Sequence, residues 1–185
     1  HIWVRAFNDG VYDDGIGDLR GIINKLDYLN DGNPDTDSDL GVTAIWLSPI
    51  FECSYKESNM HGYDTTDYYS INNRFGKKAD LAELLNAAHA RGMRVIFDFV
   101  PNHTSSSHPW VKENINLYKH AATNPGWPSA WDSSDYSNSV WFSYGTSYVY
   151  SAFQTSSLFD LDYDNTEVVS RMQNVLTYWL NHKFN

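Results

Sequence analysis

The sequence predicts a parallel α/β fold, and two observations carry this prediction. In the first hundred residues, short apolar segments alternate with segments of helical periodicity, in the order strand, helix, strand, helix, strand. The runs 42–50 and 93–100 are almost continuously apolar, which is typical of strands buried on both faces of a parallel sheet. With 185 residues, the chain is long enough for one domain with a sizeable core.

The elements of this alternation are predicted in chain order. Three segments are short, apolar and rich in β-branched or aromatic residues, which predicts strands: 1–7, 42–50 and 93–100. Two segments carry apolar residues three and four positions apart, which predicts helices: 18–31 and 77–92. Asp18 suits the N-cap of the first helix, and Gly92 suits the position after the end of the second.

The amino-acid composition of the sequence changes after residue 103. Residues 104–157 are rich in Ser, Tyr, Trp, Asn and Pro, which predicts an irregular excursion with a short antiparallel element in VWFSYGTSYVYSAF. Their aromatic content argues against disorder. Helical periodicity returns at 165–185, where either Asn165 or Thr166 is the expected N-cap.

Charge and composition narrow the classes of partner. The net charge of −10 disfavours nucleic acid and anionic membranes, because both would be repelled, and it favours a neutral substrate or a cation. No stretch approaches the twenty continuous apolar residues that span a membrane. Aromatic residues make up 16% of the chain; most are expected in the core, and a minority could stack on sugars. Cys53 is the single cysteine, so no internal disulfide forms.

Functional residues of parallel α/β folds gather at the carboxyl ends of the strands. That rule selects three segments: 8–18 and 52–68, which follow the first two predicted strands, and 98–103, around the end of the third. The last one, DFVPNH, places the carboxylate of Asp98, the amide of Asn102 and the imidazole of His103 at the end of a buried strand.

Four motifs give these segments a family resemblance. DFVPNH resembles the D-x-x-x-N-H signature of the α-amylase superfamily of glycoside hydrolases. The other three motifs resemble segments of the same family, in the family's order: DDGIGDLRGI, HGYDTTDY (61–68) and LFDLDYDN (158–165). Together they cover almost the whole chain.

The resemblance implies a partial (β/α)₈ TIM barrel, comprising its first three βα units, with an inserted irregular domain B. The implied division is barrel domain A over 1–103, domain B over 104–157, and a return to the barrel and its third helix over 158–185. It also implies action on an α-glucan or maltooligosaccharide by a retaining mechanism with two carboxylates.

The resemblance also implies substrate-binding residues. His103 matches a histidine that hydrogen-bonds the sugar, and Tyr63 matches a tyrosine that stacks on that sugar. Asp64 is expected to bind sugar hydroxyls, and His61 either contacts the ligand or structures a turn. Asp98 matches an aspartate that supports the site without being catalytic.

Calcium is the cofactor that the resemblance implies, at two places. Asn102 and Asp160 match oxygen ligands between the barrel and domain B, with a turn-forming role as the alternative for Asn102. The loop 8–18 resembles a calcium-binding loop whose candidate ligands are Asp9, Asp13, Asp14, Ile16 and Asp18. A plain acidic surface loop is the alternative interpretation of this segment.

The catalytic carboxylates of the family are expected beyond Asn185, in a G-F-R-x-D pattern and on later strands. The expectation is therefore a fragment that needs the remainder of the barrel and is inactive alone. The start at His1 shows no signal peptide and is compatible with a trimmed or truncated end, while a polymer-degrading enzyme is expected to be extracellular or periplasmic. Two alternatives remain open: an exo-acting α-glucosidase or glucosyl-transferring relative, and a non-catalytic glucan-binding domain.

Overall fold

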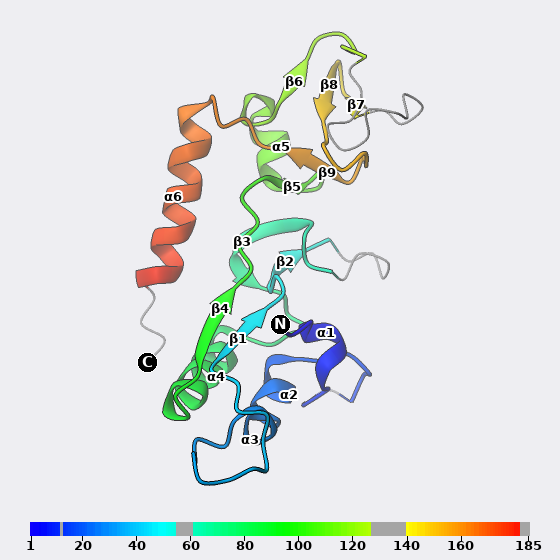
Figure 1. Cartoon of the computed structure of the whole chain (residues 1–185). Helices are drawn as coiled ribbons and strands as arrows, with labels where there is room; N and C mark the ends of the chain where they lie inside the picture. Colours follow the sequence, from blue (N-terminus) through cyan, green and yellow to red (C-terminus); the bar gives the residue numbers. More distant parts are fainter. Residues whose placement is uncertain (12, 55–60, 127–139, 182–185) are drawn as a thin grey trace.

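The parallel strands predicted at 42–50 and 93–100 form the centre of the lower part of the molecule (Figure 1). The computed structural model describes residues 1–11, 13–54, 61–126 and 140–181. Strands β1 (Ala44–Leu47) and β4 (Arg94–Phe97) pair in parallel along their whole length. Helix α4 (Lys78–Ala90) connects back to β4 and ends before Gly92, whose φ of 76° suits glycine. The predicted parallel α/β unit is confirmed.

The prediction of a strand over 1–7 is wrong beyond its second residue. Ile2 makes one parallel bridge to Leu47, and the chain then turns into the short helix α1 (Val4–Phe7). The backbone of this turn bonds to other parts of the chain: the Ser48 hydroxyl accepts from the Val4 N–H at 3.3 Å. The Arg5 carbonyl accepts from the Gly17 N–H at 2.6 Å. These tertiary hydrogen bonds override the local strand propensity.

The helix predicted over 18–31 is two helices, α2 (Leu19–Ile23) and α3 (Leu26–Leu29). Lys25, between them, leaves the helical region with φ −112° and ψ 9°, and its N–H bonds to the carbonyl three residues earlier. The apolar positions of both pieces are nevertheless buried: Leu19, Ile22, Leu26 and Leu29. The periodicity therefore predicted the buried residues correctly, whereas the prediction of one continuous helix is wrong.

An antiparallel pair that the sequence pattern did not indicate follows β1. Strand β2 (Phe51–Cys53) pairs with β3 (Thr65–Ile71), so part of the segment 52–68 is sheet rather than loop. Residues 55–60 of that segment lie outside the described residues. Strand β3 lies between β1 and the upper part of the molecule (Figure 1).

The excursion after β4 is built from short elements. They are β5 (His103–Ser105), α5 (Pro109–Glu113), the 3₁₀ turn η2 (Ile115–Leu117), β6 (His120–Ala121), β7 (Trp141–Tyr144), β8 (Ser147–Tyr150) and β9 (Leu158–Asp160). The predicted antiparallel element is confirmed as the β7–β8 hairpin, to which β6 adds a third strand. Strand β9 pairs antiparallel with β5, so the chain returns beside the point where it left.

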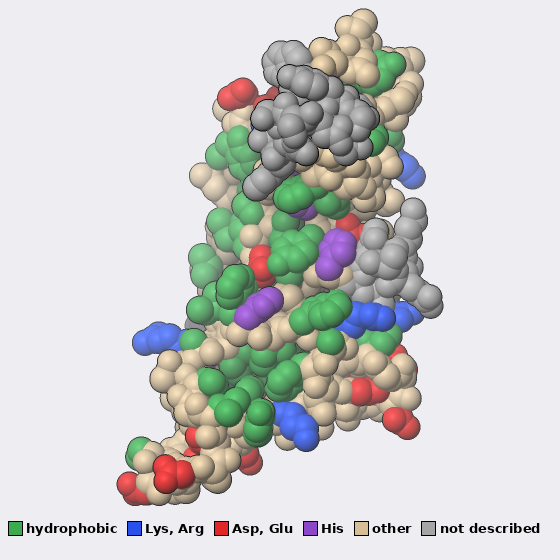
Figure 2. All heavy atoms as spheres, turned by 45° about the vertical axis from the view of Figure 1, so that its right-hand side comes forward, with side chains coloured by type: hydrophobic (Ala, Val, Ile, Leu, Met, Phe, Trp, Pro, Cys, Tyr) green, Lys and Arg blue, Asp and Glu red, His purple; other side chains and the backbone are tan. Residues whose placement is uncertain are grey.

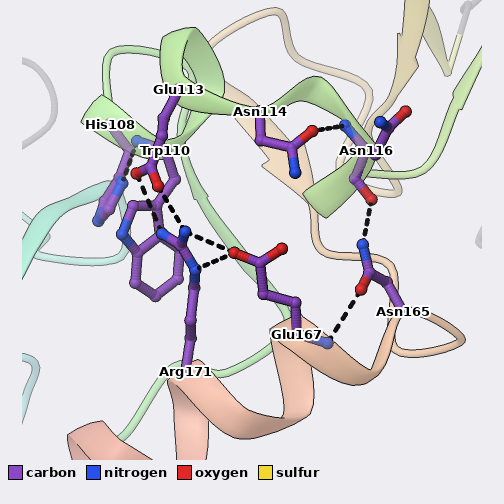
Figure 3. Close-up of polar contacts among 8 residues, drawn as sticks. All are labelled: His108, Trp110, Glu113, Asn114, Asn116, Asn165, Glu167 and Arg171. Atoms are coloured by element: carbon purple, nitrogen blue, oxygen red, sulfur yellow. Dashed lines mark hydrogen bonds and ion pairs between the residues drawn. The ribbon is translucent and has the colours of Figure 1, made fainter.

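Helix α6 (Thr166–Asn181) confirms the helix predicted from residue 165, with residues 182–185 outside the described part. Asn165 is its cap, because its side-chain oxygen accepts from the Glu167 N–H at 2.9 Å. Arg171 joins the helix to α5 through Glu113 and also pairs with Glu167, one turn earlier on α6 (Figure 3). Its guanidinium carbon lies 5.0 Å from the centre of the Trp110 ring on α5.

No helix in the described ranges is long and apolar enough to cross a membrane.

Candidate functional site

A pocket of about 320 Å³ lies beyond the carboxyl ends of β1 and β4, where the site is expected from the sequence. It is lined by His61, Tyr63, His103, Phe153 and Leu158. Figure 2 shows histidine and hydrophobic side chains side by side in the middle of one face of the molecule. Three of the four predicted substrate-binding residues therefore converge on one cavity.

Tyr63 presents its ring to this pocket while its hydroxyl is fixed. The hydroxyl donates to Asp98 Oδ2 at 3.0 Å, and the residue remains 37% exposed. Partial burial, reinforced by the hydrogen bond and the charge of Asp98, raises the pKa of Tyr63, so the phenol stays neutral. The contact also places Asp98 next to the pocket, as its predicted supporting role requires.

Gly62 makes the approach of Tyr63 to β1 sterically feasible. Its φ is 84°, and a Cβ at this position would lie 2.4 Å from the carbonyl oxygen of Pro49, which follows β1. Because L-residues rarely adopt that φ and backbone cannot yield to such a contact, this position requires glycine.

His103 is 3% exposed, and both of its ring nitrogens have protein partners. Nε2 lies 2.9 Å from the Tyr63 carbonyl oxygen, and Nδ1 lies 3.2 Å from the Asn102 amide nitrogen. Because a carbonyl only accepts, Nε2 carries the proton and Nδ1 accepts. Burial lowers the pKa of His103; the bond to the Tyr63 carbonyl opposes this shift and nearby His61 adds to it. The neutral ring therefore anchors the backbone of Tyr63.

His61 completes the aromatic floor of the pocket. Its ring stacks on that of Tyr63, with centroids 5.7 Å apart and an interplanar angle of 30°. Its Nδ1 accepts from the Tyr63 N–H at 3.0 Å, which is a turn-structuring contact. His61 thus structures the turn and also lines the pocket, while its contact with a ligand stays a prediction.

Asp64, the fourth predicted substrate-binding residue, is buried and does not line the cavity. Its carboxylate accepts from the Ser54 hydroxyl, and its backbone carbonyl accepts from the Ser54 N–H at 3.3 Å. These contacts hold the start of β3 against the end of β2. A sugar-binding role for Asp64 stays a prediction.

Tyr68 is a positioning residue that was not selected from the sequence. Its buried hydroxyl lies 2.8 Å from the Val100 carbonyl and 3.0 Å from the His103 carbonyl, where the chain leaves β4. Its own carbonyl accepts from the Trp179 indole N–H at 2.7 Å. Strand β3 and helix α6 thereby fix the backbone that presents His103. The motif HGYDTTDY contains Tyr68, but its pattern does not reveal which face the ring takes.

Phe153 and Leu158 form the wall of the pocket contributed by the excursion. Phe153 follows β8, is 51% exposed, and meets the His103 ring edge to face with centroids 5.1 Å apart. Leu158 begins β9, which pairs with the strand that starts at His103. Neither residue was selected from the sequence: Leu158 comes near residue 103 through the β5–β9 pairing, and Phe153 reaches it from the segment between β8 and β9.

The candidate calcium ligands Asn102 and Asp160 lie side by side. The Asp160 carboxylate is buried, accepts from the Ala152 N–H at 3.2 Å and hydrogen-bonds with the Asn102 side chain. Burial raises the pKa of Asp160, opposed by these hydrogen bonds and by Lys119. Carboxylate and amide oxygens are ligands of the kind calcium uses, but in this arrangement the Asn102 side chain turns an N–H group to the carboxylate. A calcium ion at Asn102 and Asp160 stays a prediction.

The candidate loop 8–18 is organised by its own backbone. Asp18 is buried and accepts from the Gly10, Val11 and Gly21 N–H groups, the last at 2.6 Å as the cap of α2. The other aspartates of the loop are also turned to amides: Asp9 accepts from the N–H groups of Asp13 and Gly15, and Asp14 from that of Ile16. Across the described ranges, no three His, Cys, Asp or Glu side chains converge on a common metal position. The arrangement of this loop therefore does not fit a bound ion.

The chemistry of the pocket is that of a neutral binding site. It combines a flat face from Tyr63 and His61 with an aromatic wall from Phe153, and Asp98 adds one carboxylate at its edge. Aromatic faces beside a few fixed polar groups match a ligand with apolar C–H faces and hydroxyls, such as a hexose.

Comparisons with known proteins show which chains this one is similar to. A family model described as "Alpha amylase, catalytic domain" matches residues 1–185. The chain is 34% identical over 180 residues to alpha-amylase 3 of Dictyoglomus thermophilum, covering 97% of this chain and 33% of that protein. It is 36% identical over 190 residues to probable oligo-1,6-glucosidase 2 of Bacillus subtilis, covering 97% and 31%.

A solved structure of an alpha-amylase is also similar to this chain. The alpha-amylase from H. orenii superposes with a TM-score of 0.81 and 42% identity, over 97% of this chain and 36% of that one. The chain thus spans about a third of the length of the Dictyoglomus and Bacillus relatives.

Proposed function

The chain belongs to the alpha-amylase family, whose catalytic-domain model matches it from residue 1 to residue 185, and its fold is that of part of a (β/α)₈ barrel. On this premise we propose that the protein hydrolyses α-1,4-glucosidic bonds in starch or maltooligosaccharides with retention of configuration. The relatives include an alpha-amylase and a probable oligo-1,6-glucosidase, which supports a glycoside hydrolase that acts on α-glucans. The bond type, the stereochemistry and the endo action are the parts we propose.

The pocket around Tyr63 is the observation that carries this proposal. A glucose ring has two faces of C–H groups and a rim of hydroxyls. The Tyr63 and His61 rings offer an apolar face to such a ring, and the pocket volume of about 320 Å³ suits a single sugar unit. The Asp98 carboxylate keeps the Tyr63 ring in one orientation.

His103 supports the pocket through its neighbours in this arrangement, and its hydrogen bond to the sugar stays a prediction. Its Nε2 holds the Tyr63 carbonyl, so the pocket floor is in place before substrate arrives. Because its pKa is lowered, the imidazole stays neutral at neutral pH and adds no charge that would oppose an oxocarbenium-like transition state.

Retaining hydrolysis needs two carboxyl groups about 5–5.5 Å apart, one as nucleophile and one as acid and base. Beside the pocket, Asp98 accepts a hydrogen bond from the Tyr63 hydroxyl and suits a supporting role. We propose that the reacting carboxylates come from outside these 185 residues, in keeping with a chain that spans about a third of its relatives.

The test is release of reducing sugar from soluble starch, measured for the 185-residue chain and for the full-length protein that contains it. We expect a ladder of maltooligosaccharides from the full-length protein and no release from the chain alone. Release by the chain would mean that its own carboxylates react and would overturn the assignment of the catalytic residues.

An exo-acting function is the alternative within the family, because the chain is also similar to a probable oligo-1,6-glucosidase. Release of glucose from isomaltose or from chain ends, without a ladder, would favour it. A non-catalytic glucan-binding protein is the alternative outside the enzymes. Binding without hydrolysis by the full-length protein would select it.

Calcium and location are further parts of the proposal. We propose calcium at Asn102 and Asp160, because a buried carboxylate there lies beside an amide. An extracellular or periplasmic location is what a starch-degrading activity would require. Fractionation of the producing cells would test the location.

A further inference from the structure

A second cavity of about 400 Å³ lies in the excursion, away from the residues that line the Tyr63 pocket. Its lining is Lys119, His120, Trp141, Tyr150, Asp162 and Asp164. None of these residues lines the pocket around Tyr63. The two cavities are related through β9, which begins with Leu158 at the first cavity and ends just before Asp162 at the second.

Two aromatic rings of this cavity are held by sheet pairing. Trp141 on β7 and Tyr150 on β8 are direct cross-strand partners, and their rings meet edge to face with centroids 5.3 Å apart. The Lys119 ammonium lies 5.8 Å from the centre of the Tyr150 ring. A cross-strand pair on a hydrogen-bonded hairpin is a rigid platform, so a ligand could stack on it at little cost in conformational entropy.

The polar groups are fixed to the same platform by backbone hydrogen bonds. The Lys119 carbonyl accepts from the Tyr150 N–H at 2.8 Å, and the Lys119 N–H donates to the Asp160 carbonyl at 3.0 Å. On the other side, the Asp162 N–H donates to the Leu117 carbonyl at 2.9 Å. A lysine from before β6 and an aspartate from after β9 are thereby brought to the same cavity.

The mixture of groups selects the class of ligand. Two carboxylates, Asp162 and Asp164, disfavour an anion, and the ammonium of Lys119 in the same cavity disfavours a simple cation. An apolar ligand would leave these charges desolvated without partners. A neutral polyol satisfies both signs, because each hydroxyl donates to a carboxylate or accepts from an ammonium, while its C–H face covers an aromatic ring.

We propose that this cavity, built on Trp141 and Tyr150, binds a sugar unit of an α-glucan chain at a second site separate from the Tyr63 pocket. The sugar type, α-linked glucose, rests on the proposed function, whereas the choice of a polyhydroxylated ligand rests on the cavity itself. A glucan chain held here would raise the local concentration of substrate at the Tyr63 pocket.

The experiment is calorimetric titration of the 185-residue chain with maltoheptaose, in a Tyr63→Ala background that removes the ring of the first pocket. We expect binding to persist, with a Kd on the order of 1 mM, because a small, exposed site recovers little free energy. Trp141→Ala in this background should weaken binding at least tenfold. Asp164→Asn, at an exposed position, should weaken it about threefold by removing one charged acceptor.

Tyr28→Ala is the matched control, since Tyr28 is an aromatic residue on α3, 56% exposed, that lines neither cavity. Near-ultraviolet circular dichroism reports whether Trp141→Ala still folds, and Asp164→Asn provides a test that leaves the sheet untouched. Affinities for Trp141→Ala and Asp164→Asn equal to that of Tyr28→Ala would overturn the second site, as would complete loss of binding in Tyr63→Ala alone. Failure of the proposed function would appear separately, as absence of starch hydrolysis by the full-length protein.

Discussion

Tyr63 unites an accessible ring with a hydroxyl fixed by Asp98, which makes it the residue on which the proposed site depends most. The two ends of its side chain have different tasks. The ring contacts the ligand, while the hydroxyl and the backbone are held by Asp98, His61 and His103. Replacing the side chain should therefore affect turnover far more than folding.

We expect Tyr63→Ala to lower kcat/KM of the full-length protein on maltoheptaose by about 100-fold, because the sugar loses its stacking surface and its orientation. The free energy of unfolding should change by only about 1 kcal/mol, since the side chain is partly exposed. Tyr28→Ala is the control for removal of an exposed aromatic ring. Turnover within about threefold of the unmodified protein would remove Tyr63 from the site.

His108 is a buried titratable residue outside the pocket. Its Nδ1 accepts from the Trp110 N–H at 3.1 Å and so caps α5. Burial lowers the pKa of His108 from 6.5 to about 4; Asp67 and Glu113 oppose this shift and Arg171 adds to it. Protonation of the ring would remove the acceptor on which the cap depends.

Stability should therefore depend on pH through this residue. Between pH 6.5 and about 4, the unfolded chain binds a proton at His108 that the folded chain does not, so the free energy of unfolding should fall as pH falls. The total loss of unfolding free energy from this residue is about 3 kcal/mol and is complete near pH 4. His108→Asn keeps a capping oxygen and should flatten the slope in urea unfolding between about pH 4 and 7. His89→Asn, on the exposed end of α4, should leave it unchanged; equal slopes in both variants would contradict the assignment.

At the scale of the elements, short helices and strands here depend on tertiary hydrogen bonds more than on their own length. Helix α2 has five residues and would not persist alone. Asp18 caps it by accepting from the Gly21 N–H and holds the loop before it by accepting from the Gly10 and Val11 N–H groups. The same aspartate thus determines both the start of the helix and the shape of loop 8–18.

We expect Asp18→Ala to lower the free energy of unfolding by about 2–3 kcal/mol, because a cap is lost and buried N–H groups are left without an acceptor. Since backbone groups rather than an ion are the partners, the loss should be the same with and without a chelator. Asp14→Ala, at an exposed position of the same loop, should cost less than about 1 kcal/mol. A loss for Asp18→Ala that appears only with calcium present would instead identify it as an ion ligand.

At the scale of the whole molecule, the described residues expose apolar surface on both faces of the β1–β4 sheet. A groove of about 420 Å³ runs between β4 and α6. On the other face, Trp46 and Ile96 are cross-strand partners that remain 47% and 53% exposed. Exposed apolar surface of this extent marks a contact site. It is consistent with the proposal that further barrel strands pack against this part of the chain.

Calcium would connect two parts of the molecule, because Asn102 and Asp160 lie where the chain leaves and re-enters its lower part. If they hold an ion, millimolar calcium should raise Tm by about 5 °C relative to a chelator, since only the folded state binds it. Asp160→Ala should abolish the difference, whereas Asp35→Ala, in the exposed acidic loop, should preserve it. An identical Tm in calcium and in chelator would exclude the site.

The parallel strands, helices α4 and α6, the β7–β8 hairpin and the family could all be predicted from the amino-acid sequence, because they depend on periodicity and on motifs that are local in the chain. The segments that hold Tyr63, His61 and His103 could be selected from the ends of the predicted strands, and these residues themselves from their match to the family motifs.

The remaining features became visible only in the folded chain. The predicted first strand is reduced to one bridge at Ile2, and Asp18, predicted as a cap, also accepts from the Gly10 and Val11 N–H groups of the loop before its helix. Phe153 lies against His103, and Trp141 lies against Tyr150. These outcomes depend on which backbone groups meet after the chain has folded back on itself. Hydrogen bonds between distant residues leave no period in the sequence, so pattern alone cannot reveal them.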